Sequence, residues 1–172
     1  MGKENWYVIQ TISAHESRIK LMCEECIHKD ILKKCVMPVC EEKKRFNGKW
    51  HIREKRLFPG YLFLVTEQLE LLQKELEKIE SVTKLLGVGK DIVPLSEEEV
   101  CFIRQLTGDS DTVKMSEGII EHDKVKVLCG PLVGLESTIC KIDRHKRKAW
   151  INTEIFGRQQ LIEVGLEVIK KI

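Results

Sequence analysis

The stretch 107–117 divides the chain into two parts whose hydrophobic patterns differ. The stretch itself has no hydrophobic periodicity and is rich in glycine, aspartate and serine, as linkers are. Strand-like and helix-like patterns alternate before it, whereas only short strand-like runs follow it. We therefore expect an α+β domain over 1–106, a linker over 107–117 and an all-β domain over 118–172.

The first part begins with a strand and a helix. Residues 6–12 are rich in aromatic and β-branched residues, which favours a strand, and a helical pattern follows over 15–28. Residues 36–57 predict a long hairpin around Asn47-Gly48, a dipeptide that tolerates the positive φ angles of a type I′ turn. The further expected elements are a strand over 61–65, a helix over 69–79, a strand over 81–86 and a helix over 96–106. This order predicts an antiparallel sheet flanked by helices.

The second part shows no helical pattern. Its short runs of β-branched and aromatic residues are separated by turn residues, at the spacing of a small barrel. A closed barrel leaves no strand edge exposed, which suits a domain of this small size. The expected strands lie at 124–128, 137–142, 150–155, 160–164 and 166–169.

Composition excludes several classes of protein. Of the 172 residues, 42% are hydrophobic, and 29 Lys and Arg oppose 27 Asp and Glu, so the chain is neither disordered nor a one-signed tail. The longest apolar run without a charge, 57–66, is too short to cross a bilayer, and no secretion signal opens the sequence. We therefore expect a cytoplasmic protein without a membrane partner, and we expect it to be a monomer.

The seven cysteines allow two interpretations. Their odd number and irregular spacing fit a reducing compartment, where a free cysteine behaves as a small apolar side chain. Cys23 and Cys26, followed by Cys35 and Cys40, can be drawn as four zinc ligands. Cys23 and Cys26 also fall with Ile19 on one apolar face of the predicted helix, which favours a place in the core. We favour the core and expect no cofactor, with a metal site as the alternative.

Positive charge gathers at two places in the sequence. One is the predicted hairpin, where seven basic residues between 43 and 56 accompany Glu54 as the only acid. The other is the turn at 144–148, whose like charges repel one another unless solvent or an external anion balances them. Both indicate phosphate binding, although a charged tip can also serve only to keep a hairpin soluble. The candidate nucleic-acid-binding residues are Lys43, Lys44, Arg45, Lys49, Arg53, Arg144, His145, Lys146, Arg147 and Lys148.

No pattern typical of an enzyme is found in the sequence. It has no phosphate-binding loop, no zinc-protease helix and no nucleophile elbow. Residues 87–90 (GVGK) are too short for a Walker loop and lack the Ser or Thr that follows its lysine. The five histidines are scattered without an evident catalytic partner. We therefore expect a protein that is not an enzyme.

Several short motifs occur in an order that is specific to one family. They are 6–8 (WYV), 58–61 (FPGY), 123–127 (DKVKV), 130–131 (GP) and 155–158 (IFGR). With these motifs the chain closely resembles the NusG family of transcription elongation factors over nearly its whole length. The resemblance implies an N-terminal NGN domain, a flexible linker and a C-terminal KOW barrel.

The resemblance also implies how the first domain works. In the family, an apolar, aromatic-lined patch of the NGN domain grips the clamp helices of the largest RNA polymerase subunit and so suppresses pausing. The candidate polymerase-binding residues are Phe58, Pro59 and Tyr61, which match that patch, with Trp6, Phe63, Leu85 and Leu86 as neighbours. Aromatic side chains on a rigid Pro-Gly corner lose little conformational entropy on binding. Trp6 and Phe63 are also expected to fill the core of the domain.

The sequence departs from the housekeeping members of the family. Leu132 and Leu135 replace the usual phenylalanines, and Cys129 replaces an acidic or amide residue, in the loop that helps recruit the Rho terminator or ribosomal protein S10. The turn at 144–148 is also more basic than in ordinary members. These features resemble the specialised LoaP-type antiterminators of Gram-positive bacteria, which are thought to recognise an RNA hairpin in the leader of their operon.

The resemblance therefore implies an operon-specific antiterminator with RNA polymerase and nascent RNA as partners. Another branch, the RfaH type, reads nontemplate DNA near the first NGN helix, but Glu24 and Glu25 in that helix would repel phosphate. We therefore favour a structured leader RNA, with nontemplate DNA as a further candidate partner. One alternative is a housekeeping NusG whose KOW domain recruits proteins. The other is a KOW-type RNA-binding or ribosome-associated protein that never binds polymerase.

Overall fold

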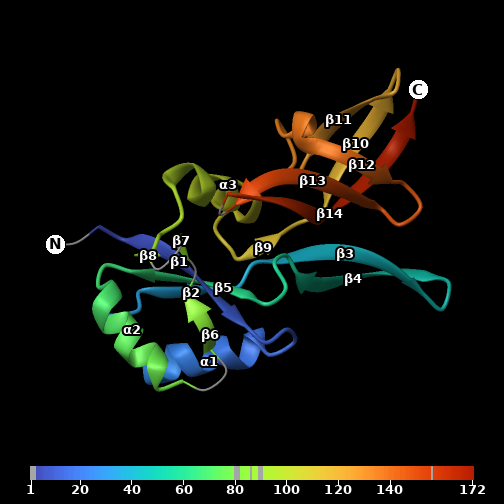
Figure 1. Ribbon diagram of the computed structural model, residues 1–172. Coiled ribbons are helices and arrows are strands. Elements are labelled where there is room, and N and C mark those ends of the chain that lie inside the picture. The colour runs from blue at the N-terminus through green and yellow to red at the C-terminus, as the bar shows by residue number, and fades with distance from the viewer. Residues whose placement is uncertain (1–2, 80–81, 86, 89–90, 156) are drawn as a thin grey trace. The chain divides into compact units, whose positions relative to one another are not determined.

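The structure of the chain is a computed structural model (Figure 1). It describes residues 3–79, 82–85, 87–88, 91–155 and 157–172. Three α-helices and four separate sheets form within these ranges. No helix within them is both long enough and apolar enough to span a membrane.

Contacts group the chain into two compact units. The first unit comprises Met1–Met37 and Phe58–Val100, and the second comprises Pro38–Leu57 and Cys101–Ile172. The basic hairpin expected from the sequence therefore belongs to the same unit as the C-terminal strands. That residues 1–106 and 118–172 fold as separate domains joined by a linker stays a prediction.

The first unit is built on a four-stranded sheet. Its strands are β1 (Asn5–Thr11), β2 (Lys34–Val36), β5 (Tyr61–Thr66) and β6 (Val82–Leu85). Their order is β2-β5-β1-β6, and every pair is antiparallel. The most hydrophobic strand of the sequence, β5, is therefore an interior strand, as an apolar run without alternation predicts.

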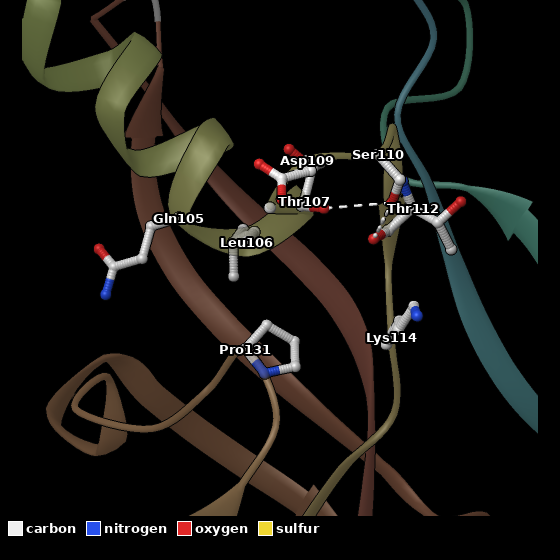
Figure 2. A pocket seen from close by; sticks show the side chains of 9 residues that line it. Gln105, Leu106, Thr107, Asp109, Ser110, Thr112, Lys114 and Pro131 are labelled. Carbon is white, nitrogen blue, oxygen red and sulfur yellow. Dashed lines mark hydrogen bonds between the residues drawn. The ribbon is translucent and has the colours of Figure 1, made fainter.

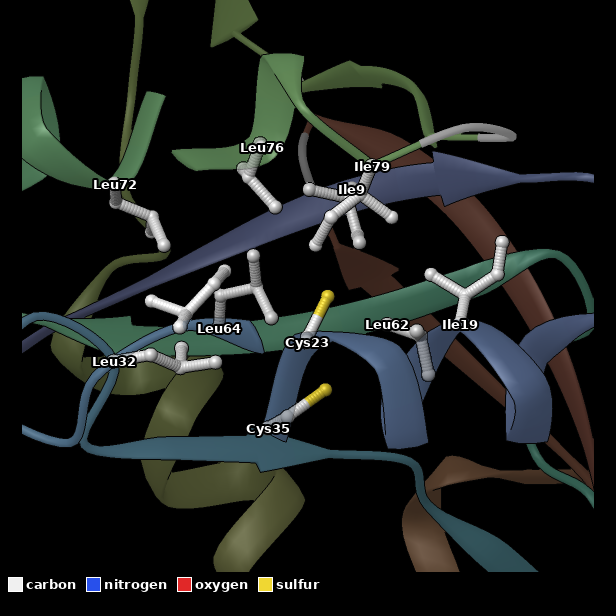
Figure 3. Close-up of a cluster of buried hydrophobic side chains, with 11 residues drawn as sticks. Ile9, Ile19, Cys23, Leu32, Cys35, Leu62, Leu64, Leu72, Leu76 and Ile79 are labelled. Atoms are coloured by element: carbon white, nitrogen blue, oxygen red, sulfur yellow. The ribbon is translucent and has the colours of Figure 1, made fainter. Parts of the chain in front are cut away.

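Two helices cover one face of this sheet. They are α1 (Glu16–Cys26) and α2 (Leu69–Glu77), and their apolar side chains meet those of β1, β2 and β5 (Figure 3). The spacing of Leu72 and Leu76 places both on one side of α2, which explains why the sequence pattern predicts this helix. The core cluster consists of Ile9, Ile19, Cys23, Ile27, Leu32, Cys35, Leu62, Leu64, Leu72, Leu76 and Ile79.

The opposite face of the sheet is buried as well. Trp6, Val8 and Phe63 alternate in direction with the core residues, and each is less than one tenth exposed. Val8 lies directly opposite Phe63 in the register of β1 and β5. A sheet buried on both faces needs apolar residues at every position, so the uninterrupted run in β5 is explained by its surroundings.

The third helix, α3 (Glu97–Thr107), begins with the expected capping box. The Ser96 hydroxyl accepts a hydrogen bond from the Glu99 amide at 3.1 Å, and the Glu99 carboxylate accepts one from the Ser96 amide at 3.0 Å. Before it, β7 (Gly87–Val88) and β8 (Asp91–Ile92) pair as a two-stranded sheet. Of the strand expected over 81–86, β6 contains 82–85, and residues 81 and 86 lie outside the described ranges.

A five-stranded sheet forms the C-terminal part of the second unit. Its strands are β10 (Ser116–Glu121), β11 (Lys124–Cys129), β12 (Ile139–Asp143), β13 (Lys148–Ile155) and β14 (Arg158–Lys171). Their order is β11-β10-β14-β13-β12, with β10 parallel to β14 and the other pairs antiparallel. A short 3-10 helix, Glu136–Thr138, precedes β12. This all-β arrangement fits the small KOW barrel implied by the resemblance.

The basic hairpin forms as expected. It consists of β3 (Val39–Phe46) and β4 (Lys49–Arg56), and β9 (Thr112–Val113) pairs with the start of β3. Asn47 and Gly48 have φ angles of 50° and 74°, as a type I′ turn requires. The predicted turn is therefore confirmed, and it sets the register that pairs Phe46 with Lys49.

Two expectations for the second part are wrong in detail. The stretch 107–117, expected to be a linker, contains β9 and the beginning of β10. The strands expected at 160–164 and 166–169 form one strand, β14, that continues through Gly165. Both β10 and β14 are paired on two sides, and this pairing by distant segments decides their conformation more than their own composition does.

Candidate nucleic-acid and polymerase interfaces

The basic hairpin is joined to β13 and β14 by ion pairs. Glu42 of β3, whose side chain is 3% exposed, lies 2.6 Å from Arg53, 3.2 Å from Lys148 and 3.5 Å from Lys55. Glu163 of β14 lies 2.5 Å from Lys148 and 2.7 Å from Lys55. Two carboxylates therefore hold three basic side chains where the hairpin meets the C-terminal strands.

A second group of charges lies around Glu167 of β14. Its carboxylate is 2.5 Å from the ammonium group of Lys43 and 3.4 Å from the guanidinium group of Arg147. The guanidinium carbon of Arg147 lies 4.0 Å from the ring centre of Trp50, a cation–π distance. The turn between β12 and β13 is thus fixed against the hairpin by both charge and an aromatic ring.

The backbone of β3 comes close to β14 at Gly165. A Cβ atom at this position would lie 2.8 Å from the carbonyl oxygen of Glu41, which is closer than real Cβ contacts. Beside it, the thiol of Cys40 donates a hydrogen bond to the carbonyl oxygen of Glu163 at 3.4 Å. The amide of Met115 donates to the Glu41 carboxylate at 3.2 Å. Glycine at 165 therefore permits the approach on which the ion pairs depend.

These contacts change the acidity of the three carboxyls. Burial alone raises the pKa of Glu42, but the hydrogen bond from Arg53 and the nearby ammonium groups of Lys148 and Lys55 outweigh it and lower the pKa from 4.5 to about 2. The pKa of Glu163 is lowered in the same way, because Lys148 and Lys55 outweigh its burial. A hydrogen bond from Lys43 outweighs burial and lowers the pKa of Glu167. All three groups are therefore carboxylates at neutral pH.

We expect acid to loosen the hairpin from the C-terminal strands. The pKa of Glu42 is lower in the folded chain than its ordinary value, so its stabilising contribution is complete above about pH 5 and is lost as the pH falls toward 2. The shift corresponds to roughly 3 kcal/mol of unfolding free energy. Urea titrations followed by the NMR signals of the β3 amides, at about pH 6 and about pH 3, measure this loss. An unchanged midpoint at the lower pH would contradict it.

The turn between β12 and β13 exposes the other basic side chains. The Asp143 carboxylate accepts a hydrogen bond from the Lys146 amide at 2.9 Å, and the Arg147 carbonyl accepts one from the Leu166 amide at 3.0 Å. Arg144, His145 and Lys146 are exposed between these anchors. The described residues form no ion pair with them. The turn therefore presents positive charge to solvent on a fixed backbone.

The candidate nucleic-acid-binding residues thus separate into two groups. Lys43, Arg53, Arg147 and Lys148 are held by carboxylates within the second unit. The group that is exposed and forms no ion pair with any described residue consists of Lys44, Arg45, Lys49, Arg144, His145 and Lys146. The exposed group is the one that can reach a phosphate without breaking an existing contact.

The candidate polymerase patch contains a buried aromatic cluster. The ring centres of Phe58 and Phe63 are 5.4 Å apart at 73°, and those of Trp6 and Phe63 are 6.2 Å apart at 52°. Phe58 is 9% exposed, Phe63 is 1% exposed and Trp6 is 7% exposed. Leu85 ends β6, and Leu86 lies outside the described residues. Within the first unit, the aromatic cluster serves as core.

The turn after Phe58 brings other side chains of the patch to the surface. Pro59 precedes Gly60, whose φ of +84° is the conformation that a type II turn needs at this position. The Tyr61 amide donates to the Phe58 carbonyl at 3.2 Å, and the Thr11 amide donates to the Gly60 carbonyl at 2.8 Å. Pro59 is exposed and Tyr61 is half-buried, so these two are the accessible members of the predicted patch.

The cysteines are placed mainly by packing. Cys23 and Cys35 lie in the core cluster, which confirms their interpretation as core residues, and Cys40 is buried beside β14. Burial raises the pKa of the Cys23 thiol to about 11. Cys26 is exposed, so its predicted place on the buried face of the helix is wrong. No group of three or more His, Cys, Asp or Glu that could hold a metal occurs in the part of the chain that the structure describes.

An open pocket in the second unit involves none of the predicted site residues. It lies beside the C-terminal end of α3 and is lined by 105–110, Thr112, Lys114 and Pro131 (Figure 2). The Ser110 hydroxyl there donates a hydrogen bond to the Thr107 carbonyl at 3.3 Å and accepts one from the Thr112 amide at 3.2 Å. The Ser110 hydroxyl is thus used by the turn that forms the pocket.

Comparison with known proteins decides between the families that this two-unit fold allows. The family described as "Transcription termination factor nusG" matches residues 4–104, which is more than half of the chain. The chain belongs to the NusG family. The expected resemblance is confirmed at this level, and the first unit with its aromatic cluster lies mostly within the matched residues.

Relatives of this NusG-family protein match it from end to end. The protein named "Transcription termination/antitermination protein NusG" from Borreliella burgdorferi is 29% identical over 180 residues, covering 97% of this chain and 98% of that protein. Those of the same name from Thermus thermophilus and Bacillus subtilis are 29% and 26% identical, covering at least 96% of both chains. A solved structure on domain interaction in Thermotoga maritima NusG covers 96% of this chain and 94% of its own with a TM-score of 0.63, and its 23% identity shows the fold alone.

The loop after Gly130 contains the leucines that depart from the housekeeping pattern of the family. Leu132, which stands where the resemblance expects phenylalanine, is fully buried, and its amide donates to the Ser116 hydroxyl at 3.1 Å. Leu135 is half-buried, whereas Cys129 is exposed beside Glu117. Of the two leucines that replace phenylalanines, one is therefore part of the packing of the second unit.

Four residues of the interface were not among the sequence candidates. Glu42, Glu163 and Glu167 form ion pairs with basic residues that include predicted phosphate-binding residues. The ring of Trp50 makes a cation–π contact with Arg147. The available signal was an acid on a strand directly before a basic run, as at Glu42, which precedes Lys43. Nothing in the sequence pairs it with Lys148, which lies in another segment of the chain.

Proposed function

We propose that this NusG-family protein is an operon-specific processive antiterminator that binds RNA polymerase through its NGN domain and structured leader RNA through its KOW domain. The observation that carries the proposal is the exposed group Arg144, His145 and Lys146 on the fixed turn between β12 and β13, which forms no ion pair with the described residues. A cluster of exposed cations attracts a polyanion, and each phosphate that it neutralises releases a counterion, which favours binding. A-form RNA presents phosphates and a shallow minor groove that such side chains read largely by shape.

Tethering explains how two modest contacts give specific recruitment. When one domain is bound to polymerase, the local concentration of the other near the nascent transcript is raised, and overall affinity can exceed either contact alone. Selection then comes from the leader RNA, and processivity comes from the polymerase contact. The alternative function is that of a housekeeping NusG whose KOW domain recruits protein, and the end-to-end match to curated NusG relatives favours it.

Binding of the full chain to leader RNA across a salt series separates these two functions. We expect selective binding that the double variant Arg144→Ala, Lys146→Ala weakens, with the salt slope reduced by roughly 0.7 to 0.9 for each phosphate that the variant no longer neutralises. The matched control is the double variant Lys170→Ala, Lys171→Ala, which removes two exposed lysines near the C-terminus. Arg147 and Lys148 are left intact because their replacement would break ion pairs. Equal affinity for unrelated RNA would support the housekeeping function instead.

Tyr61→Ala is expected to abolish readthrough of terminators while leaving RNA affinity unchanged. Tyr61 is half-buried, and removal of an aromatic anchor from an interface weakens binding by roughly tenfold or more. Reconstituted transcription through a terminator measures readthrough, and RNA titration of the same variant measures affinity. Leu71→Ala, which removes an exposed apolar side chain from α2 of the same unit, is the control. Normal readthrough by the Tyr61→Ala variant would show that Tyr61 does not contribute to polymerase binding.

A further inference from the structure

The hairpin and the turn between β12 and β13 meet at Trp50. The guanidinium group of Arg147 lies over one side of its ring at 4.0 Å, yet 37% of Trp50 remains exposed. Glu167 fixes Arg147 at 3.4 Å and is itself fixed by Lys43 at 2.5 Å. The exposed part of an indole is thus held in a defined position at the edge of a basic surface.

The register of the hairpin adds a further positive charge to this place. Arg45 lies directly opposite Trp50 in the antiparallel pair, so the two side chains share one face of the hairpin. Lys43, two residues before Arg45 on the same strand, points to the same face and reaches Glu167 of β14. Arg45 is therefore the cross-strand neighbour of the ring that Arg147 of the turn contacts.

The chemistry of this surface differs from that of a simple basic tip. Exposed Arg and Lys side chains neutralise phosphates without regard to base, whereas an exposed aromatic ring stacks on an unpaired base. RNA stem–loops present both features together, since phosphates line the stem and bases of the loop are free to stack. A blunt duplex offers the phosphates but no unpaired base.

We propose that Arg45 and Trp50 of the hairpin bind the same RNA molecule as Arg144 and Lys146 of the turn, with an unpaired base stacked on Trp50. The RNA site is then composite, because segments about a hundred residues apart in the sequence each supply part of it. The inference rests on the proposed function, since it takes RNA as the ligand, and it adds the ring and the hairpin arginine to that site.

The test uses the full chain and two fluorescently labelled RNAs, a stem–loop of the leader RNA with an unpaired purine in its loop and the same stem as a blunt duplex. We expect Trp50→Ala to weaken binding of the stem–loop roughly tenfold and to change binding of the duplex much less. Trp50→Phe keeps an aromatic ring and is expected to retain most of the stem–loop affinity. Thermal unfolding of both variants checks that the hairpin still forms.

Arg45→Ala tests the electrostatic half of the same site. It is expected to weaken binding of both RNAs and to lower the slope of log affinity against log salt by about one unit or slightly less. Arg18→Ala, an exposed arginine in α1 of the first unit, is the matched control and is expected to leave both affinities unchanged.

The outcomes distinguish this inference from the function on which it rests. If Arg45→Ala and Trp50→Ala bind the stem–loop like the unaltered chain while Arg144→Ala, Lys146→Ala does not, the composite site is overturned and RNA binding by the turn stands. If Trp50→Ala weakens stem–loop and duplex equally, stacking of a base is overturned. If the unaltered chain binds neither RNA, the proposed function itself fails.

Discussion

Glu42→Gln is expected to lower the free energy of unfolding of the second unit by roughly 3 kcal/mol. The side chain of Glu42 is 3% exposed and faces Arg53, Lys148 and Lys55 within 3.5 Å. Glutamine keeps the shape but removes the charge, so Arg53 loses its ion pair with Glu42, and Lys148 and Lys55 keep only that with Glu163. Removing one partner of a buried ion pair costs more than the pair contributes, because the remaining charges stay desolvated. Such a loss typically costs about 3 to 5 kcal/mol, and the exposure of Arg53 places the expected value at the lower end of that range.

Residue-resolved urea titration measures this effect where it arises. NMR signals from amides of β3 and β14 are expected to lose their protection at lower urea than in the unaltered chain, whereas those of β1 and β5 keep theirs. Glu154→Gln is the matched control, because Glu154 is an exposed glutamate of β13 in the same unit. Its effect is expected to stay within about 0.5 kcal/mol. Equal midpoints for the two variants would show that the ion pairs contribute little to packing of the hairpin.

Phe63→Ala is expected to destabilise the first unit by roughly 3 to 5 kcal/mol. Phe63 is 1% exposed, lies in an interior strand of the four-stranded sheet and contacts the rings of Trp6 and Phe58. The substitution removes the transfer free energy of a buried ring and leaves a cavity that a paired strand cannot close. It also removes two aromatic contacts, each worth about 0.5 to 1.5 kcal/mol beyond the buried area.

The unfolding midpoint of β1 and β5 amides in urea measures this destabilisation. Phe63→Leu fills part of the cavity and is expected to cost clearly less than Phe63→Ala. Phe46→Ala removes the same side chain at the hairpin tip, where 67% is exposed, and is expected to change stability by less than about 0.5 kcal/mol. A change below about 1 kcal/mol in Phe63→Ala would mean that the aromatic cluster is not part of the core.

The local elements follow closely from the sequence where the chemistry is local. The capping box at Ser96 and Glu99 and the turn at Asn47-Gly48 each form where their residues predict. The apolar spacing of α2 predicts its core face for the same reason, since the residues that determine it are neighbours along the chain. These features need no knowledge of what lies on the other side of the sheet.

Strand β10 shows where local reasoning ends. Its six residues include Ser116, Gly118 and two glutamates, so neither alternation nor β-propensity marks it. It forms because β11 pairs on one side of it and β14 on the other. Pairing with β14 joins segments about fifty residues apart, and no pattern within 116–121 records it.

The candidate RNA site divides in the same way. The sequence by itself determined where positive charge is concentrated, because side-chain charge depends on residue type alone. Only the tertiary structure decided which of those charges are available. Glu163 and Glu167 of β14 form ion pairs with basic side chains of the hairpin, whereas Arg45, Arg144 and Lys146 stay exposed. The physical reason is that an ion pair requires two groups within a few ångströms, and the fold brings together Lys43 and Glu167, 124 residues apart.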